Sequence, residues 1–138
     1  MTAHYRRVHL ILIKSAMDVE REQLSKNFFR DEFSCPCCGK DDVKDDLARR
    51  VQEVRDLLEK SITINSGVRC SAHNKSVGSK ESSSHLTGYA ADIRCDSSFY
   101  RKELLTAVSQ VFDRFGIAQS FIHVDVDPSK SASCWLYT

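Results

Sequence analysis

The feature that most constrains the fold is a short alternating run near the C-terminus, FIHVDVD at Phe121–Asp127. Successive side chains of a β-strand point to opposite faces. Alternation therefore places the aromatic, histidine and aspartate side chains on one face and the three aliphatic side chains on the other. Such a strand borders a core on one side and a polar site on the other. We expect a strand over residues 120–126 that carries His123 and Asp125 into a functional site.

A second segment, SSHLTGYAAD at Ser83–Asp92, holds His85 and Asp92 seven residues apart. This spacing does not place the two on one face of a helix. It fits a histidine at the end of a loop, a turn at Gly88, and an aspartate on the strand that follows. A lone histidine is more often an ordinary surface or core residue. Together with His123, however, two imidazoles and a carboxylate are the ligand set typical of one catalytic zinc ion, with water in the fourth position.

Amphipathic helices are expected on both sides of this segment. The first covers residues 45–60 and is capped by one of its two leading aspartates. The second begins at Ser97 or Ser98, runs to about residue 115 and is stopped by Gly116. The expected apolar faces consist of Leu47, Val51, Val54, Leu57 and Leu58 in the first helix, and of Leu104, Leu105, Val108, Val111, Phe112 and Phe115 in the second.

Short strands are expected at residues 62–64, 89–94 and 135–137, in addition to the alternating run. Residues 70–84 are polar, rich in Ser, Lys and Gly, and show no period, so they predict a long loop. Because helices and strands do not alternate strictly, the expected fold class is α+β, with a small antiparallel sheet flanked by helices.

Length and composition narrow the function. A chain of 138 residues fits one domain, which we place at 24–138, after an N-terminal arm or extra helix at 1–23. The net charge of +1 gives no bulk signal for nucleic acid or an anionic membrane, and a monomer is expected. No apolar run reaches the ~20 residues of a membrane helix. The apolar run Val8–Ile13 lacks a small-residue cleavage site, so no signal peptide is expected.

The six cysteines leave two alternatives open. Cys35 and Cys38, with Cys37 between them, have the C-x-x-C spacing of half a metal site. A complete site needs two more ligands. No second C-x-x-C exists, although Cys70 could supply one ligand. We favour buried, inert thiols and keep a second, structural metal as the alternative.

The paired motifs resemble a known family. The pattern S-x-H-x-x-G-x-A-x-D at Ser83–Asp92, followed by H-x-D at His123, is similar to that of the zinc D-alanyl-D-alanine carboxypeptidases and phage endolysin peptidases, whose zinc site Hedgehog signalling domains share. The resemblance implies a fold like theirs. It covers about residues 24–137, and its smaller elements are Ser66–Arg69 with Asn74, Phe33 with Cys35–Gly39, and Trp135, the last two resembling the small phage-type branch.

Carried over by position, the resemblance implies that His85, Asp92 and His123 bind zinc. It also implies that Arg69 binds the carbonyl or carboxylate of the substrate, a role that a planar guanidinium suits. We add Ser83 and His73 to the substrate-binding side. Ser83 is expected to orient the site by hydrogen bonding, whereas His73 is either a substrate contact or an exposed loop residue.

The general base stays open. Many members of the family have an acidic residue three positions before the last histidine ligand, where this chain has Ser120. Asp125 is the nearest substitute, on the same strand face as His123. It is either the base or a partner that orients a ligand histidine. Asp127 is a weaker candidate for the base.

The function that the resemblance implies is a zinc metallopeptidase that hydrolyses peptide bonds in the stem peptides of bacterial peptidoglycan, as a D,D-carboxypeptidase or an endolysin-type endopeptidase. The alternative is a non-catalytic zinc module that binds cell-wall peptide or a protein partner. Without an export signal, we expect the protein in the cytoplasm of the producing cell, acting on the wall after release, and of phage or prophage origin.

Overall fold

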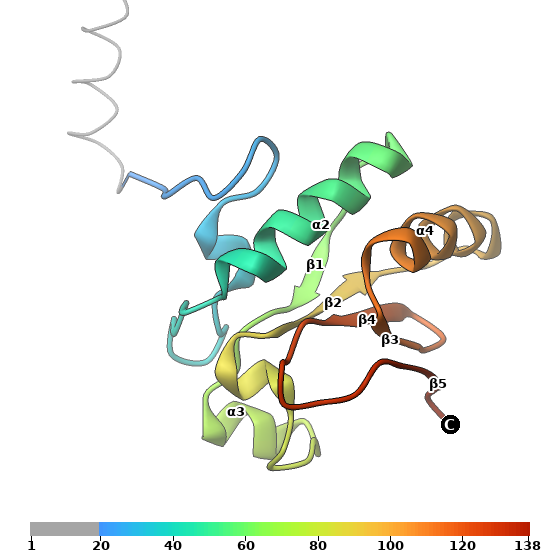
Figure 1. Ribbon diagram of the computed structural model, residues 1–138. Coiled ribbons are helices and arrows are strands. Elements are labelled where there is room, and N and C mark those ends of the chain that lie inside the picture. Colours follow the sequence, from blue (N-terminus) through green and yellow to red (C-terminus); the bar gives the residue numbers. More distant parts are fainter. Residues whose placement is uncertain (1–19) are drawn as a thin grey trace, which may run out of the picture.

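The computed structural model describes residues 20–138 (Figure 1), so the arm or helix expected at residues 1–23 lies almost wholly outside the described residues. In chain order the elements are η1 (Arg30–Phe33), α2 (Asp45–Leu58), β1 (Ile64–Ser66), α3 (Ser71–Ser76), η2 (Ser84–Thr87), β2 (Ala90–Arg94), α4 (Ser98–Val111), β3 (Arg114–Ile117), β4 (Phe121–Asp125) and β5 (Ser133–Leu136). None of the helices in this part of the chain is both long and apolar enough to cross a lipid bilayer.

The five strands form one sheet in the order β1-β2-β4-β3-β5. Every neighbouring pair is antiparallel except β3 and β5, which run parallel. Helices α2 and α4 pack together on one side of this sheet (Figure 1). The expected α+β class with a small, mostly antiparallel sheet is therefore confirmed.

The alternation expected for the two central strands explains how the sheet separates core from site. Ile93 on β2 and Ile122 and Val124 on β4 are fully buried in the hydrophobic core beneath the helices. The residues between them therefore face the other side of the sheet. Asp92 is the register partner of His123 across the β2–β4 pair, so these two side chains emerge next to each other.

Helix α2 follows the expected helix 45–60 closely, with two differences. Its N-cap is Lys44, which makes no side-chain cap, and the aspartates expected as caps lie in the first turn instead. In the first turn, their negative charges still interact favourably with the positive end of the helix dipole. Leu57, expected on the buried face, is 52% exposed, because the 3.6-residue repeat places it to one side of the stripe formed by Val51, Val54 and Leu58.

Helix α4 confirms Ser97 as the cap, since the Ser97 hydroxyl accepts a hydrogen bond from the Tyr100 N–H. The predicted end of the helix was wrong. The helix stops at Val111, and Arg114–Ile117 form strand β3. Gly116 is therefore a strand residue, not a helix stop. Pairing of this segment with both β4 and β5 outweighs its local helical pattern.

The long loop expected at residues 70–84 was also wrong in part. It contains the short helix α3, whose N-cap Cys70 accepts the His73 N–H at its sulfur, and it runs into η2. Asn74 is the buried residue within α3, so this helix lacks the apolar period by which a sequence reveals a helix. The strand expected at residues 62–64 lies two residues later, at β1, and the strands expected at 89–94, 120–126 and 135–137 are present with shifted ends.

Two glycines fix the segment of residues 33–44 against the site. A Cβ atom at Gly67 would lie 2.5 Å from the Phe33 carbonyl oxygen, and one at Gly88 would lie 2.3 Å from the Asp42 carbonyl oxygen. Gly88 also has a φ of 79°, which L side chains rarely adopt. The backbone therefore approaches itself closely two residues before Arg69 and directly after the segment that carries His85.

Candidate metal centre

Three buried side chains from one 3-10 helix and two strands converge on one point. His85 comes from η2, Asp92 from β2 and His123 from β4. His123 Nδ1 lies 3.0 Å from Asp92 Oδ1 and 3.2 Å from His85 Nε2. The distance from His85 Nε2 to Asp92 Oδ1 is 3.3 Å. In the part of the chain that the structure describes, this is one of two clusters whose side chains could hold a metal ion.

The hydrogen bonds at the outer edges of the two imidazoles define their tautomers. His85 Nδ1 lies 2.7 Å from the Gly67 carbonyl oxygen, and His123 Nε2 lies 3.0 Å from Asp125 Oδ2. A carbonyl and an ionised carboxylate only accept hydrogen bonds, so both outer nitrogens carry a proton. In neutral imidazoles the inner nitrogens are then bare lone pairs. Both lone pairs face Asp92 and each other.

This arrangement fits a divalent cation. Two nitrogen lone pairs and a carboxylate oxygen repel one another unless positive charge lies between them. Burial raises the pKa of the Asp92 carboxyl, but its contacts with His123 and His85 lower that pKa well below the usual range. Burial lowers the pKa of His123, but its hydrogen bonds to Asp125 and Asp92 raise it above the ordinary value. The residues therefore favour positive charge at their centre, and two imidazoles with one carboxylate suit zinc.

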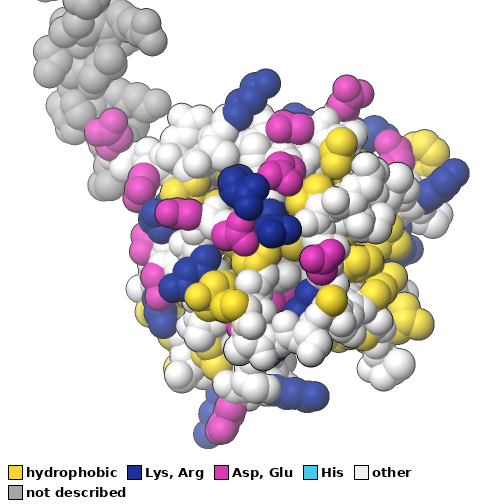
Figure 2. All heavy atoms as spheres, in the orientation of Figure 1, with side chains coloured by type: hydrophobic (Ala, Val, Ile, Leu, Met, Phe, Trp, Pro, Cys, Tyr) yellow, Lys and Arg dark blue, Asp and Glu magenta, His cyan; other side chains and the backbone are white. Residues whose placement is uncertain are grey.

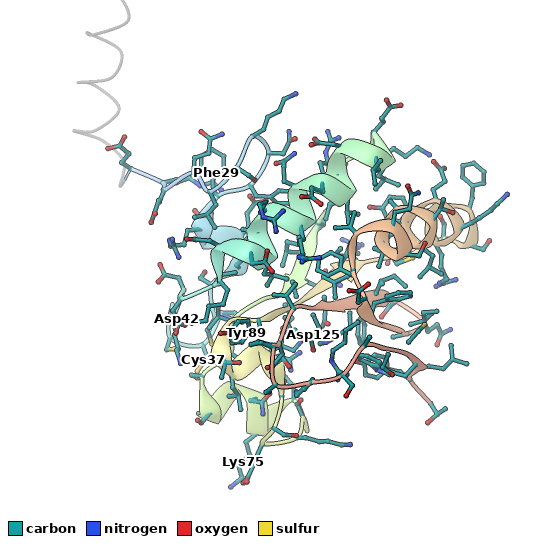
Figure 3. All side chains as sticks on the ribbon, viewed as in Figure 1. Phe29, Cys37, Asp42, Lys75, Tyr89 and Asp125 are labelled. Carbon is teal, nitrogen blue, oxygen red and sulfur yellow. The ribbon has the colours of Figure 1, made fainter. Side chains whose placement is uncertain are left out.

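Asp125 lies behind His123, as seen from the point where the three side chains meet. Its Oδ2 accepts from His123 Nε2 and lies 3.3 Å from Arg114 Nε, and its Oδ1 accepts the Asp127 N–H at 2.8 Å. Its side chain, labelled in Figure 3, is 1% exposed. Burial raises the pKa of Asp125, but the His123 contact and the Asp127 N–H bring it down to about 2. Of the two roles left open by the sequence, this position favours orienting His123 over acting as the base.

Arg69 is buried and holds the other oxygen of Asp92. Its Nη2 lies 3.2 Å from Asp92 Oδ2, while its Nε donates to Ser66 Oγ at 3.0 Å and its Nη1 donates to Asn74 Oδ1 at 3.4 Å. Asp92 therefore presents Oδ1 to the histidines and Oδ2 to the guanidinium. Arg69 thus forms a buried ion pair with Asp92.

The other residues singled out in the sequence lie around this group. The Ser83 hydroxyl accepts the His85 backbone N–H at 3.3 Å, which helps to place His85. His73 is half-buried on α3 and is not part of the cluster. Ser120 is exposed in the turn before β4, where its carbonyl accepts the Cys95 N–H. Roles of Ser83 and His73 in substrate binding stay predictions.

Sequence reasoning missed the wall that β3 and β5 build beside His123. The Trp135 ring lies 5.4 Å from the His123 ring between centroids, and the Arg114 guanidinium carbon lies 4.6 Å from the Trp135 centroid. Gly116 makes room for this wall, because a Cβ there would lie 2.5 Å from the indole and 2.7 Å from the Tyr137 ring. Gly116 pairs with His123 in the sheet, so alternation would have revealed Arg114 and Gly116 had residues 114–117 been recognised as a strand.

Comparison with known proteins identifies the family. A family model described as Peptidase M15 matches residues 13–125, which is most of the chain. A search of curated proteins finds no match. The chain belongs to the M15 peptidases, a family of metallopeptidases that in general depend on zinc and act on peptidoglycan peptides.

Proposed function

We propose that this protein is a zinc-dependent hydrolase of the stem peptides of bacterial peptidoglycan, with His85, Asp92 and His123 as the ligands of the catalytic zinc. The observation that carries the proposal is that the ring nitrogen of each imidazole that faces away from the centre is hydrogen-bonded to another group of the protein. With Gly67 and Asp125 accepting hydrogen bonds from the outer N–H groups, the inner nitrogens of the neutral imidazoles face Asp92 with lone pairs that can bind a metal. Membership of the M15 family supports the same reaction class.

The chain's own residues would divide the work as follows. A zinc ion at this centre supplies activation of water and polarisation of the scissile carbonyl. Asp125 keeps the proton of His123 on Nε2 and so leaves Nδ1 free to bind the metal. Arg69 restrains Asp92 and brings positive charge beside the centre, where a substrate carbonyl or carboxylate would lie.

The aromatic wall would give the substrate its second surface. Trp135 is half-buried beside the His123 ring, and Tyr137 is 45% exposed. A peptide bound at the metal would therefore lie against these rings on one side. We propose a monomer that meets its substrate in the cell wall after release from the producing cell, as expected of a phage or prophage enzyme.

A specific observation also favours the second candidate, a zinc module that binds cell-wall peptide without cleaving it. The position of the family's acid is Ser120, which cannot accept a proton from water. Both oxygens of Asp125 already accept hydrogen bonds from the protein. If catalysis occurs, the proton must therefore leave by another group or by a rearrangement of Asp125.

The experiment that separates the two candidates is mass spectrometry of purified peptidoglycan after incubation with zinc-loaded protein. The proposal predicts new free amino and carboxyl ends in the stem peptides. Release of single D-alanine indicates a carboxypeptidase, and separation of cross-linked or longer peptides indicates an endopeptidase. The matched variant is His85→Ala, which should yield no new ends.

Wild-type protein that carries zinc at His85, Asp92 and His123 and sediments with cell walls, but generates no new ends, would overturn the peptidase proposal and leave the binding module. Protein that cleaves equally well with His85→Ala would overturn the assignment of the metal ligands. The same preparation, stripped of metal by a chelator and then reloaded, controls for a contaminating hydrolase.

A further inference from the structure

A second cluster of potential metal ligands lies where α3 begins. The thiol sulfurs of Cys35, Cys38 and Cys70 all lie within 4.8 Å of one another. Cys35 Sγ and Cys70 Sγ are 3.8 Å apart. Figure 3 shows Cys37, which belongs to the same turn, on the side of the molecule where Lys75 marks α3. The chain thus brings together three thiols from positions up to 35 residues apart.

The spacing of the sulfurs fits a shared zinc ion. Zinc binds thiolate sulfur at about 2.3 Å in a tetrahedron, and two corners of such a tetrahedron are about 3.8 Å apart. A disulfide would instead require sulfurs about 2.05 Å apart. The Cys35–Cys70 separation matches the edge of a zinc–thiolate tetrahedron.

Backbone hydrogen bonds shape the cluster, and one of them reaches a sulfur. The Cys35–Gly39 turn is closed by the Gly39 N–H, which donates to the Cys35 carbonyl at 2.8 Å, with Gly39 at a φ of 79°. The His73 N–H likewise donates to the Cys70 sulfur at 3.4 Å. N–H groups directed at sulfur favour the thiolate, which is the form that binds metal.

We propose that Cys35, Cys38 and Cys70 bind a second, structural zinc ion, separate from the centre at His85, Asp92 and His123. The fourth ligand would be Cys37, which belongs to the same exposed turn, although its sulfur is not among the three that lie within 4.8 Å of one another. Structural zinc sites are four-coordinate and rich in cysteine, whereas catalytic sites keep one position for water. The sequence-based preference for buried, inert thiols is thereby replaced, and it already fails for Cys37 and Cys38, which are exposed.

Such an ion would link two segments of the chain that lie next to the first centre. Cys70 follows Arg69 directly in the chain, and the Val68 N–H donates to the Phe33 carbonyl at 2.7 Å. A metal that joins Cys70 to the Cys35–Gly39 turn therefore fixes the strand-to-helix connection that supplies Arg69 and the Gly67 carbonyl.

The test is to load the full chain with Co²⁺ and to measure both the number of ions per chain and the near-ultraviolet absorption. Thiolate–cobalt charge transfer absorbs strongly there, and a site of two histidines and an aspartate does not contribute. The proposal predicts two ions and a strong thiolate band. Cys70→Ser should lose one ion and the band, whereas His85→Ala should lose one ion and keep the band. Cys134→Ser, an exposed thiol on β5, is the matched control and should change neither.

One ion per chain with no thiolate band in the wild type would overturn the proposal, and this reading does not depend on any variant folding. An intact mass two hydrogens lower than the sequence requires, with Cys35 and Cys70 joined in the peptide map, would overturn it in favour of a disulfide. Neither result would affect the centre at His85, Asp92 and His123, whose ion is counted separately through His85→Ala.

Discussion

The two clusters of potential metal ligands are built in opposite ways. At the first, His85, Asp92 and His123 are buried, and two of the three are paired across neighbouring strands in the middle of the sheet. At the second, the thiols come from a turn and a helix start, and Cys38 is exposed. On the face shown in Figure 2, acidic and basic side chains are interspersed and form no broad patch of one charge.

The difference lies in what holds each ligand. In the first cluster, side chains hold side chains: Asp125 holds His123 and Arg69 holds Asp92. In the second, the hydrogen bond that reaches a ligand from the backbone is the one from the His73 N–H to the Cys70 sulfur. Ligands held by partners on rigid strands suit a centre that must keep an open position for chemistry. Ligands held by the backbone of a turn suit an ion that joins two segments of chain.

The largest effect is expected when a ligand of the first cluster is removed. His123→Ala should abolish binding of its ion and lower peptidase activity at least about 1,000-fold, because the metal supplies several kcal/mol of transition-state stabilisation. Metal analysis should still find the ion at the cysteines. Loss of both ions from a protein with an unchanged circular dichroism spectrum would show that the clusters are not independent.

A smaller effect is expected when the partner of a ligand is changed. Asp125→Asn leaves the shape of the side chain but removes its charge, so the tautomer of His123 is less firmly held. We expect a loss of about 10–100-fold in zinc affinity or in activity. Zinc competition with a chelator measures the affinity. The control is Asp113→Asn, which changes an exposed aspartate before β3.

The same variant sharpens the assignment of Asp125. If Asp125→Asn abolishes turnover while zinc affinity stays at the wild-type value, Asp125 is the base after all. Weaker zinc binding, with activity restored by excess zinc, is the result that the geometry predicts.

Gly88→Ala tests the close contact between the turn after η2 and the backbone at Asp42. The new Cβ would meet the Asp42 carbonyl oxygen at 2.3 Å, and the residue has a φ of 79°. Overpacking and left-handed strain together should lower the free energy of unfolding by about 2–4 kcal/mol. Urea denaturation of the metal-loaded protein measures this. A change within error of zero would show that the Asp42 segment can move away from Gly88 without cost.

Gly39→Ala should have the smallest effect on stability and is the matched comparison for Gly88. Gly39 has the same φ of 79°, but a Cβ there would meet nothing within 4 Å. Only the backbone strain remains, so the free energy of unfolding should fall by about 1–2 kcal/mol. A larger loss in metal-loaded protein that disappears after chelation would show that the turn must keep its shape to bind the second ion.

The sequence predicted those parts of the fold where a strong period and a clear face coincide. Strand β4 alternates, so its aliphatic residues and its His/Asp face were assigned correctly, and the amphipathic pattern located α2 and the start of α4. These are the cases in which burial itself imposes the period.

The elements that were missed depend on partners distant in the chain. Arg114–Ile117 form β3 because β4 and β5 lie on both sides of them, and the local pattern continues that of α4. Helix α3 is short and exposed, and its cap is a cysteine, so it has neither an apolar period nor a common capping residue. The meeting of Cys70 with Cys35 likewise follows from the fold and not from spacing, since no second C-x-x-C announces it.

For the site, the sequence indicated the types of residue and their order, but not which side chains contact one another. His85, Asp92 and His123 were singled out together, and the structure brings them together. The Arg69–Asp92 and Asp125–His123 contacts bear on roles that spacing left open. These contacts depend on where the side chain of Asp125 points at the end of β4 and where that of Arg69 points after the turn at Gly67. A local sequence pattern specifies neither direction.

The most direct measurement is an anomalous difference map at the zinc edge from crystals of zinc-loaded protein. We expect a peak about 2.0–2.2 Å from His85 Nε2, His123 Nδ1 and an oxygen of Asp92, with the remaining position open to solvent. Absence of a peak there, or a fourth protein ligand closing that position, would contradict it.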